Sequence, residues 1–158
     1  MKVLGIDPGT ATCGYGIVHE SAGRLRATAH GSWSTSPGER QELRLKTIFD
    51  GVTGLLAQHA PDVVALEESY VGADARIALS VGQARGAALV ACAVAGVAAV
   101  EYAPAHVKQV VCGYGRAEKE QIKRMVRLVL GVEVKDDHAS DALAVAICHA
   151  TAPRTAAA

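Results

Sequence analysis

Aromatic side chains are scarce in this 158-residue chain, at 4% of its residues, so the core must be built from Val, Ala, Leu and Ile. Half of the residues are hydrophobic, which excludes a disordered chain, and the length suffices for one domain with a sizeable core. The four cysteines are scattered without any C-x-x-C pair. This spacing excludes the usual zinc and redox motifs and favours buried, inert thiols.

Long hydrophobic runs are also missing. The longest uncharged stretch, residues 86–100, is shorter than the roughly 18 residues of a membrane span, and we interpret it as a buried helix that runs into a buried strand. The apolar run after Lys2 is too short for a secretory signal and meets Asp7 at once. These absences predict a cytoplasmic protein without a membrane segment.

Neither positive nor negative charge dominates the chain, whose formal net charge is zero. Basic residues nevertheless gather between Pro104 and Arg127, where Glu118 and Glu120 are the only acidic ones. These basic residues are Lys108, Arg116, Lys119, Lys123, Arg124 and Arg127. A neutral protein with such a segment can bind a polyanion, because the attraction depends on the local field. A charged helix face that is merely solvated is the alternative.

The order of hydrophobic patterns predicts an α/β fold. Strands are expected near residues 3–6, 15–19, 25–34, 63–66 and 97–102, and helices near residues 39–58, 74–95, 104–111, 117–130 and 138–150. The first three strands suggest an antiparallel meander, and the later strands alternate with helices. This order implies one five-stranded mixed sheet with helices on both faces. We expect a single domain over residues 1–152 and a disordered tail over residues 153–158.

Two carboxylates stand at the ends of expected strands. Asp7 follows an apolar run and precedes a turn at Pro8-Gly9. A buried carboxylate requires compensation by a metal ion, a helix cap or a cation, although an Asx turn onto Gly9 is an alternative. Glu67 occupies the same place after the strand near 63–66, and ligands of such sheets lie beyond the carboxyl ends of the strands. If the two strands are neighbours, the carboxylates repel each other, and a divalent cation would remove that penalty.

The start of the last expected helix supplies further candidates. His138 and Asp141 are three residues apart, and Asp137 and Asp141 are four apart, so these groups share a helix face. Asp136 or Asp137 is expected to cap the helix, whereas Asp141 lies a turn further inside among apolar residues. Three carboxylates and an imidazole suit Mg²⁺ or Mn²⁺, and two such ions can hydrolyse a phosphodiester without a nucleophilic side chain.

Seven short motifs together resemble the RuvC family of bacterial Holliday-junction resolvases, which have a ribonuclease H-like fold. The motifs are Gly5-Ile6-Asp7-Pro8-Gly9, Gly14-Tyr15-Gly16, Leu66-Glu67, Gly82-Gln83-Ala84-Arg85-Gly86, Val107-Lys108-Gln109, Ala117-Glu118-Lys119 and Asp141-Ala142-Leu143-Ala144. Each motif alone is weak, but their order from about residue 2 to residue 150 is specific.

This resemblance implies a structure-specific endonuclease of homologous recombination and DNA repair. It implies a homodimer that binds a four-way junction and makes paired symmetric nicks, leaving 5′-phosphate and 3′-hydroxyl ends. It also implies the RuvA–RuvB branch-migration complex as a partner.

The resemblance assigns Asp7, Glu67 and Asp141 as catalytic metal ligands, with His138 beside them and two ions expected per subunit. The family pattern has Asp-x-x-Asp where this chain has His138 and Asp141. Because an imidazole is a softer and neutral ligand, we expect relatively better activity with Mn²⁺ than with Mg²⁺. We also expect activity to be lost as His138 becomes protonated, near its ordinary pKa of about 6.5. Asp137 is an alternative ligand.

The resemblance also implies DNA contacts. Lys108 and Lys119 are expected to meet the DNA backbone, and Lys119 to help stabilise the cleaved phosphate. Arg116, in the same basic segment, is a further expected DNA contact. Tyr70 lies where the family has an aromatic residue that can stack on a base near the crossover; an ordinary loop aromatic is the alternative.

The helix expected over residues 74–95 is assigned to the dimer interface by the same resemblance. A stripe of small or apolar residues suits close approach, and it comprises Ile77, Ala78, Val81, Ala84, Ala88 and Ala91. A helix buried inside a monomer is the alternative.

Three other functions compete with this interpretation. Actin-like ATPases and sugar kinases have a similar opening motif, but they need two such domains. A small YqgF-type nuclease shares the strand-end acids but not the Gly-Gln-Ala-Arg-Gly helix or the two lysines. A junction-binding protein that does not cut is disfavoured by the intact acids.

Overall fold

A computed structural model describes residues 1–68 and 74–152 of the chain. Its strands are β1 (Lys2–Asp7), β2 (Thr12–Ser21), β3 (Arg24–Ser34), β4 (Val63–Glu67) and β5 (Ala99–Tyr102). Its helices are α1 (Gln41–His59), α2 (Ala75–Ala95), α3 (Pro104–Cys112), α4 (Lys119–Leu130) and α5 (Asp137–Thr151). The predicted order of elements is confirmed.

The five strands form one mixed sheet in the order β3-β2-β1-β4-β5. Strands β1, β2 and β3 are an antiparallel meander, as predicted, whereas β4 runs parallel to β1 and β5 runs parallel to β4. The central residues of β1 and β4 are buried, because helices cover both faces of the sheet there. Ile6 pairs with Leu66, so β1 and β4 end side by side.

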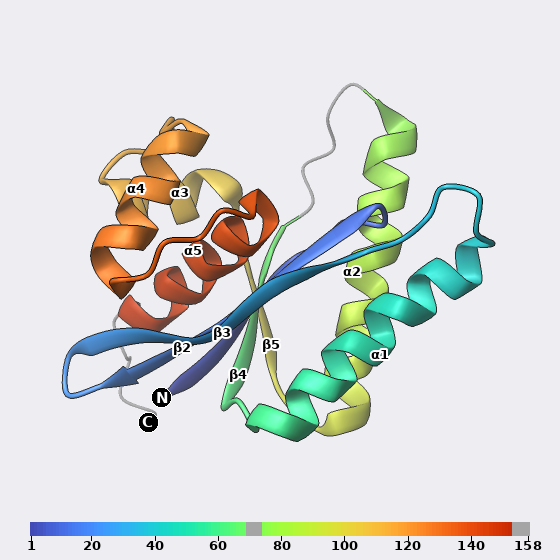
Figure 1. Cartoon of the computed structure of the whole chain (residues 1–158), viewed down its shortest axis with the longest axis horizontal. Coiled ribbons are helices and arrows are strands. Elements are labelled where there is room, and N and C mark those ends of the chain that lie inside the picture. Colours follow the sequence, from blue (N-terminus) through green and yellow to red (C-terminus); the bar gives the residue numbers. More distant parts are fainter. Residues whose placement is uncertain (69–73, 153–158) are drawn as a thin grey trace.

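Figure 1 shows the two helical layers, with α1 and α2 on one face of the sheet and α3, α4 and α5 on the other. Each layer encloses its own apolar core, because alternate residues of a strand point to opposite faces. Val3 and Ala65 pack toward α5, for example, while Leu4 and Val64 pack toward α1 and α2. The α5 helix is the most buried helix of the chain's described part.

The predicted burial of residues 86–100 is wrong in part. Strand β5 lies at the edge of the sheet and is only partly buried, and it begins at Ala99 because Gly96 ends α2 in a left-handed conformation. Helix α2 is also largely exposed. By length and composition it could cross a membrane, a test that apolar core helices pass as well, yet only 22% of its most apolar window is buried.

The predicted dimer stripe of α2 is likewise wrong in part. Ala84, Ala88 and Ala91 are fully buried against the sheet and α1, so they cannot face a partner. Ile77 of the predicted stripe is exposed, and so are Leu79, Val90 and Val94, which lie outside the stripe; these four residues are 55% to 71% exposed. Because an Ala-rich helix is apolar on every side, its sequence does not identify the face that packs on the sheet.

Candidate active site

The site begins at the carboxyl ends of β1 and β4. Because the two strands are parallel neighbours with Ile6 opposite Leu66, the next residues, Asp7 and Glu67, leave the sheet at the same edge. Asp7 is 19% exposed, and Glu67 is also partly buried. The condition set by the sequence, that these two strands be neighbours, is confirmed.

Glycines bring α5 onto this edge of the sheet. A Cβ atom at Gly5 would overlap the carbonyl oxygen of Ala142, and one at Gly14 would overlap the carbonyl oxygen of His138. Gly16, which pairs with Gly5 across β1 and β2, would similarly clash with the side chain of Leu143. The close approach of the α5 backbone therefore depends on the absence of side chains at these glycines.

This packing places the first turn of α5 beside Asp7. The Nδ1 atom of His138 lies 2.9 Å from Oδ2 of Asp7, which is hydrogen-bonding distance. The hydrogen bond to the Asp7 carboxylate raises the pKa of His138, although partial burial opposes the shift. Asp7 therefore has a cationic or hydrogen-bonding partner, as a partly buried carboxylate requires.

Lysines from α4 face the same turn of α5. The ammonium of Lys119 lies 3.5 Å from Oδ2 of Asp141 and 3.6 Å from Oδ2 of Asp137, and Lys123 also pairs with Asp137. The hydrogen bond and charge of Lys123 lower the pKa of Asp137. The structure thus brings Lys119 to the predicted site, and it occupies Asp137 with lysines rather than leaving its carboxylate free.

Three carboxyl groups interact electrostatically at this edge. Burial, together with the charges of Asp7 and Asp141, raises the pKa of Glu67 to about 7, while Lys108 and Lys119 act in the opposite direction. The pKa of Asp141 is raised by its own burial and by Asp7. The site therefore concentrates more negative charge than its neighbouring lysines balance.

This donor set suits a hard divalent cation. Three carboxylates and an imidazole are oxygen and nitrogen ligands of the kind that Mg²⁺ and Mn²⁺ accept. A cation would favour the charged form of Glu67, whose pKa is raised by burial and by the charges of Asp7 and Asp141. Across residues 1–68 and 74–152, no three His, Cys, Asp or Glu side chains are arranged closely enough to form a finished metal site. His138 and Lys119 instead hold two of the carboxylates, Asp7 and Asp141.

The remaining acid at the head of α5 has a structural role. The Asp136 carboxylate accepts hydrogen bonds from the backbone amides of His138, at 2.9 Å, and Ala139, at 3.4 Å. This is the N-cap that the sequence predicted for one of the two acids before His138. Asp136 thereby caps the start of α5.

The structure brings Lys108, but not every other predicted residue, close to the site. Lys108, on α3, is near enough to Glu67 to affect its pKa, whereas Arg116 is exposed and makes no ion pair within the described residues. Tyr70 lies outside the described residues. An open hollow of about 440 Å³ adjoins the site, lined by Asp7, Gly9, Arg76, Ser80 and His138 among others, and leaves room for a ligand beside Asp7.

Sequence reasoning missed two features that shape this site. It did not identify the glycines of β1 and β2 as the positions at which α5 approaches the sheet. The repeated glycines of β1 and β2 are the signal that could have done so. It also missed the pairing of Asp137 with Lys123, for which sequence spacing carries no signal because the contact joins two helices.

Known proteins share both this sequence and this fold. Residues 3–149 match the family described as crossover junction endodeoxyribonuclease RuvC. The RuvC protein of Chloroflexus aggregans is 49% identical over 156 residues, which cover 97% of this chain and 95% of that protein. The RuvC protein of Heliobacterium modesticaldum is 49% identical over 150 residues, covering 94% and 93% of the two chains.

Solved structures agree with these relatives. The RuvC of T. thermophilus in complex with a Holliday junction substrate superimposes with a TM-score of 0.89 and is 39% identical, covering 95% of this chain and 93% of that chain. The yeast mitochondrial Holliday junction resolvase Ydc2 superimposes with a TM-score of 0.69 over 94% of this chain and 78% of its own, at 12% identity, which shows a shared fold alone.

Proposed function

The chain belongs to the RuvC family and is a Holliday junction resolvase, and we propose that it cuts the junction where Asp7, Glu67 and Asp141 meet. Its activity is that of a crossover junction endodeoxyribonuclease in DNA recombination and repair. The observation that carries the proposed site is the convergence of two strand ends and the first two turns of α5 on one edge of the sheet.

A divalent metal ion takes part in this nuclease reaction. We infer that Asp7, Glu67, Asp141 and His138 hold two such ions per subunit, Mg²⁺ or Mn²⁺. Such ions activate a water molecule and stabilise the oxygen that leaves the phosphorus. The charges of Asp7 and Asp141 near Glu67 support this assignment, because neighbouring carboxylates attract a dication.

The basic side chains at the site have a separate role in the proposal. Lys119 lies beside Asp141, so its ammonium can neutralise a phosphate oxygen held at that point. Lys108 lies on the side of Glu67 and can contact the adjacent DNA backbone. Arg116 and Tyr70 remain expected DNA contacts, the latter by stacking on a base. Attack of water on phosphorus with departure of the 3′ oxygen leaves 5′-phosphate and 3′-hydroxyl ends.

Two symmetric nicks require two sites, whereas one chain carries one site. We propose that a homodimer forms through the exposed face of α2, where Leu79, Val90 and Val94 are exposed. Gly82 and Gly86 lie on the same helix with open space around their Cα atoms, and glycines four residues apart allow helices to approach closely. A cytoplasmic location and association with the RuvA–RuvB complex complete the proposal.

A cleavage assay on a synthetic mobile four-way junction tests the proposed site. The purified protein is incubated with Mg²⁺ and separately with Mn²⁺, alongside Asp7→Asn and Glu67→Gln variants. Glu68→Gln serves as the matched control, because Glu68 is exposed and follows Glu67 directly. We expect paired nicks from the wild type and the control, and none from the two site variants. Tight binding without cutting by the wild type under either metal would overturn the proposal.

A further inference from the structure

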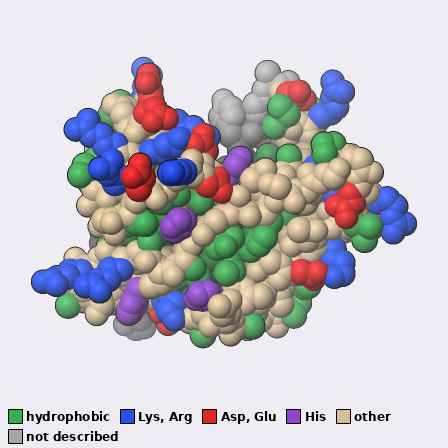
Figure 2. Space-filling model, viewed as in Figure 1, with side chains coloured by type: hydrophobic (Ala, Val, Ile, Leu, Met, Phe, Trp, Pro, Cys, Tyr) green, Lys and Arg blue, Asp and Glu red, His purple; other side chains and the backbone are tan. Residues whose placement is uncertain are grey.

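A basic groove runs along the outer side of α4. It is a hollow of about 640 Å³ between α4 and residues 131–136, which return alongside α4 to the start of α5 (Figure 1). Its charged lining consists of Lys123, Arg124, Arg127 and Lys135, together with Glu120 and Glu133. We call this hollow the α4 groove. Figure 2 shows blue basic side chains, with red acidic ones among them, over this part of the molecule.

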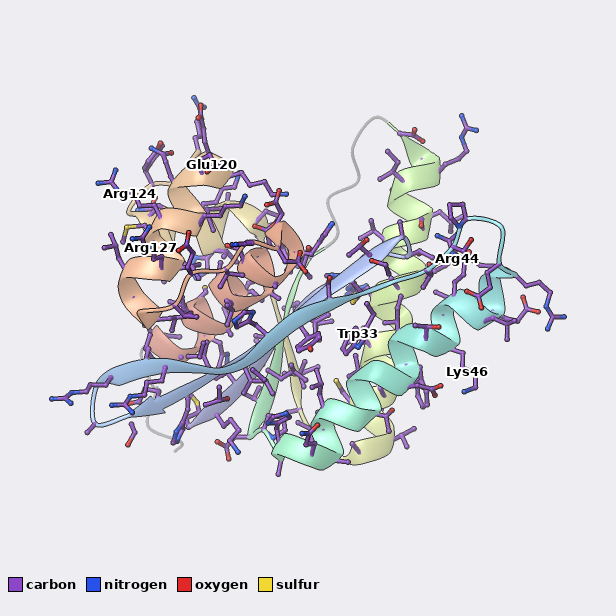
Figure 3. The ribbon with its side chains drawn as sticks, in the orientation of Figure 1. Trp33, Arg44, Lys46, Glu120, Arg124 and Arg127 are labelled. Carbon is purple, nitrogen blue, oxygen red and sulfur yellow. The ribbon has the colours of Figure 1, made fainter. Side chains whose placement is uncertain are left out.

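Most of the positive charge in the α4 groove has no partner. Lys123 pairs with Glu120 at 3.4 Å and with Asp137. Within the described residues, by contrast, Arg124, Arg127 and Lys135 form neither an ion pair nor a side-chain hydrogen bond. Figure 3 shows Glu120, Arg124 and Arg127 directed outward from α4 rather than toward the core. The groove therefore presents three free cations, which favours an anionic ligand.

Helix α4 contributes residues both to the α4 groove and to the candidate active site. Lys119, Lys123 and Arg127 are spaced four residues apart, so they lie along one side of α4. Asp137 bridges the first two, since it contacts both Lys119 and Lys123. Eight residues of helix correspond to about 12 Å, and a DNA strand carries one phosphate per roughly 3.4 Å of helix axis. The row of cations thus has the length of a few phosphates.

We propose that the α4 groove binds the phosphate backbone of the junction arm that continues away from the cut. This proposal rests on the proposed function, because it takes the site at Lys119 as the point of cleavage. A protein partner fits the groove less well: interface cores are rich in aromatic and apolar residues, whereas Leu128 is the only large exposed apolar residue in the lining. Free arginines and lysines are the groups that contact DNA phosphates.

Junction binding measured as a function of salt tests this proposal without cleavage. The double variant Arg124→Ala/Arg127→Ala is compared with the wild type in EDTA, by titrating a labelled four-way junction at several salt concentrations. Arg40→Ala/Lys46→Ala is the matched control, because it removes the same number of positive charges at α1, which covers the other face of the sheet (Figure 1). Thermal unfolding of each variant checks that the fold is intact.

The logarithm of the binding constant falls as the logarithm of the salt concentration rises. We expect the groove variant to make this slope shallower by about 1.8, the contribution of two phosphate contacts, and to weaken binding roughly tenfold near 0.1 M salt. The control should change neither quantity by a comparable amount. Equal slopes and affinities for the groove variant and the wild type would overturn the proposal and would favour an acidic protein as the ligand of the groove.

Failure of the proposed function gives a different result. If the wild type does not cut in Mg²⁺ or Mn²⁺, the assignment of the active site fails, whereas the two variants can still be compared in binding. If the wild type cuts and the groove variant binds with an unchanged salt slope, the groove proposal alone is wrong.

Discussion

Helices α5 and α2 are both apolar and lie on opposite faces of the same sheet, yet they are buried very differently. Ten of the 15 residues of α5 are buried, against four of the 21 residues of α2. Helix α5 sits on glycines of β1 and β2 and carries Asp141 and His138 to the strand ends. Helix α2 contributes no acid to the site and leaves Leu79, Val90 and Val94 exposed.

A helix can therefore be apolar for two distinct reasons. The apolar residues of α5 bury the helix within one chain and hold a chemical site in register with the sheet. Those of α2 exceed what the chain itself covers, which is typical of a surface that binds another molecule. The two helices therefore predict separable defects, one in chemistry and one in assembly.

The largest expected effect is chemical and belongs to α5. Asp141→Asn should lower the junction cleavage rate by at least about 10²-fold, because it removes a charge from the site where a cation and the phosphate would be held. Asp137→Asn, one turn earlier on the same helix, is the control. Its carboxylate pairs with lysines in a partly exposed setting, and such pairs contribute little, so its activity should change by less than about tenfold. Single-turnover rates measure both. Equal losses for the two variants would contradict the assignment of Asp141.

Two glycine substitutions test the difference in packing between α5 and α2. Gly5→Ala should destabilise the protein by about 3 kcal/mol or more, because the new methyl group would overlap the backbone of α5 at Ala142. Gly86→Ala, on α2, places its methyl group in open space and should stabilise the isolated chain by up to about 1 kcal/mol, since alanine favours a helix. Urea unfolding measures both free energies. Similar free energies of unfolding for the two variants would contradict the proposal that the glycines of β1 and β2 allow α5 to approach the sheet.

Charges on α2 test assembly without touching the site. Leu79→Glu/Val90→Glu should turn a dimer into a monomer at micromolar concentration, because both side chains are exposed in one chain and would be buried between two. The free energy of unfolding of the variant monomer should change by no more than about 0.5 kcal/mol for each substitution, as is usual at surface positions. Light scattering coupled to size exclusion measures the mass. A variant that remains dimeric would place the interface elsewhere.

The last expected effect is a pH dependence of stability that arises at the α5 side of the sheet. Glu67 in the folded protein keeps its proton up to a pKa of about 7, whereas in the unfolded chain it loses the proton near 4.5. The folded state therefore binds more protons over this interval, and the metal-free protein should lose stability as the pH rises from about 4.5 to 7.

The raised pKa values of His138 and Asp141 act in the same direction, so the Glu67→Gln variant isolates the contribution of Glu67. The variant should show a flatter dependence than the wild type when urea unfolding is followed in EDTA at several pH values. Identical pH profiles for the two proteins would show that Glu67 titrates normally.

The hydrophobic pattern of the sequence predicted the order of the strands and helices. The apolar runs of β1 and β4 end on Asp7 and Glu67, and the structure meets the condition that the two strands be neighbours. The capping acid before His138 was predicted equally well, because capping is a local property of the chain. Local rules and strand periodicity therefore sufficed for most of the fold and for the position of the strand-end acids.

The rest depends on contacts between distant segments. The face of α2 that packs on the sheet could not be predicted, because alanines and valines occur on all its sides. The partial burial of β5 depends on its place at the edge, which the order of elements alone does not fix. The hydrogen bond between His138 and Asp7 joins residues 131 positions apart and follows only from the docking of α5.

Cleavage of a supercoiled plasmid that extrudes a cruciform tests most directly whether chemistry and assembly reside on opposite faces of the sheet. Paired nicks across the junction linearise the plasmid, whereas a single nick leaves an open circle. We predict linear product from the wild type, open circles from Leu79→Glu/Val90→Glu, and neither from Asp141→Asn. Linear product from a Leu79→Glu/Val90→Glu protein shown to be monomeric, or open circles from Asp141→Asn, would contradict this division of roles.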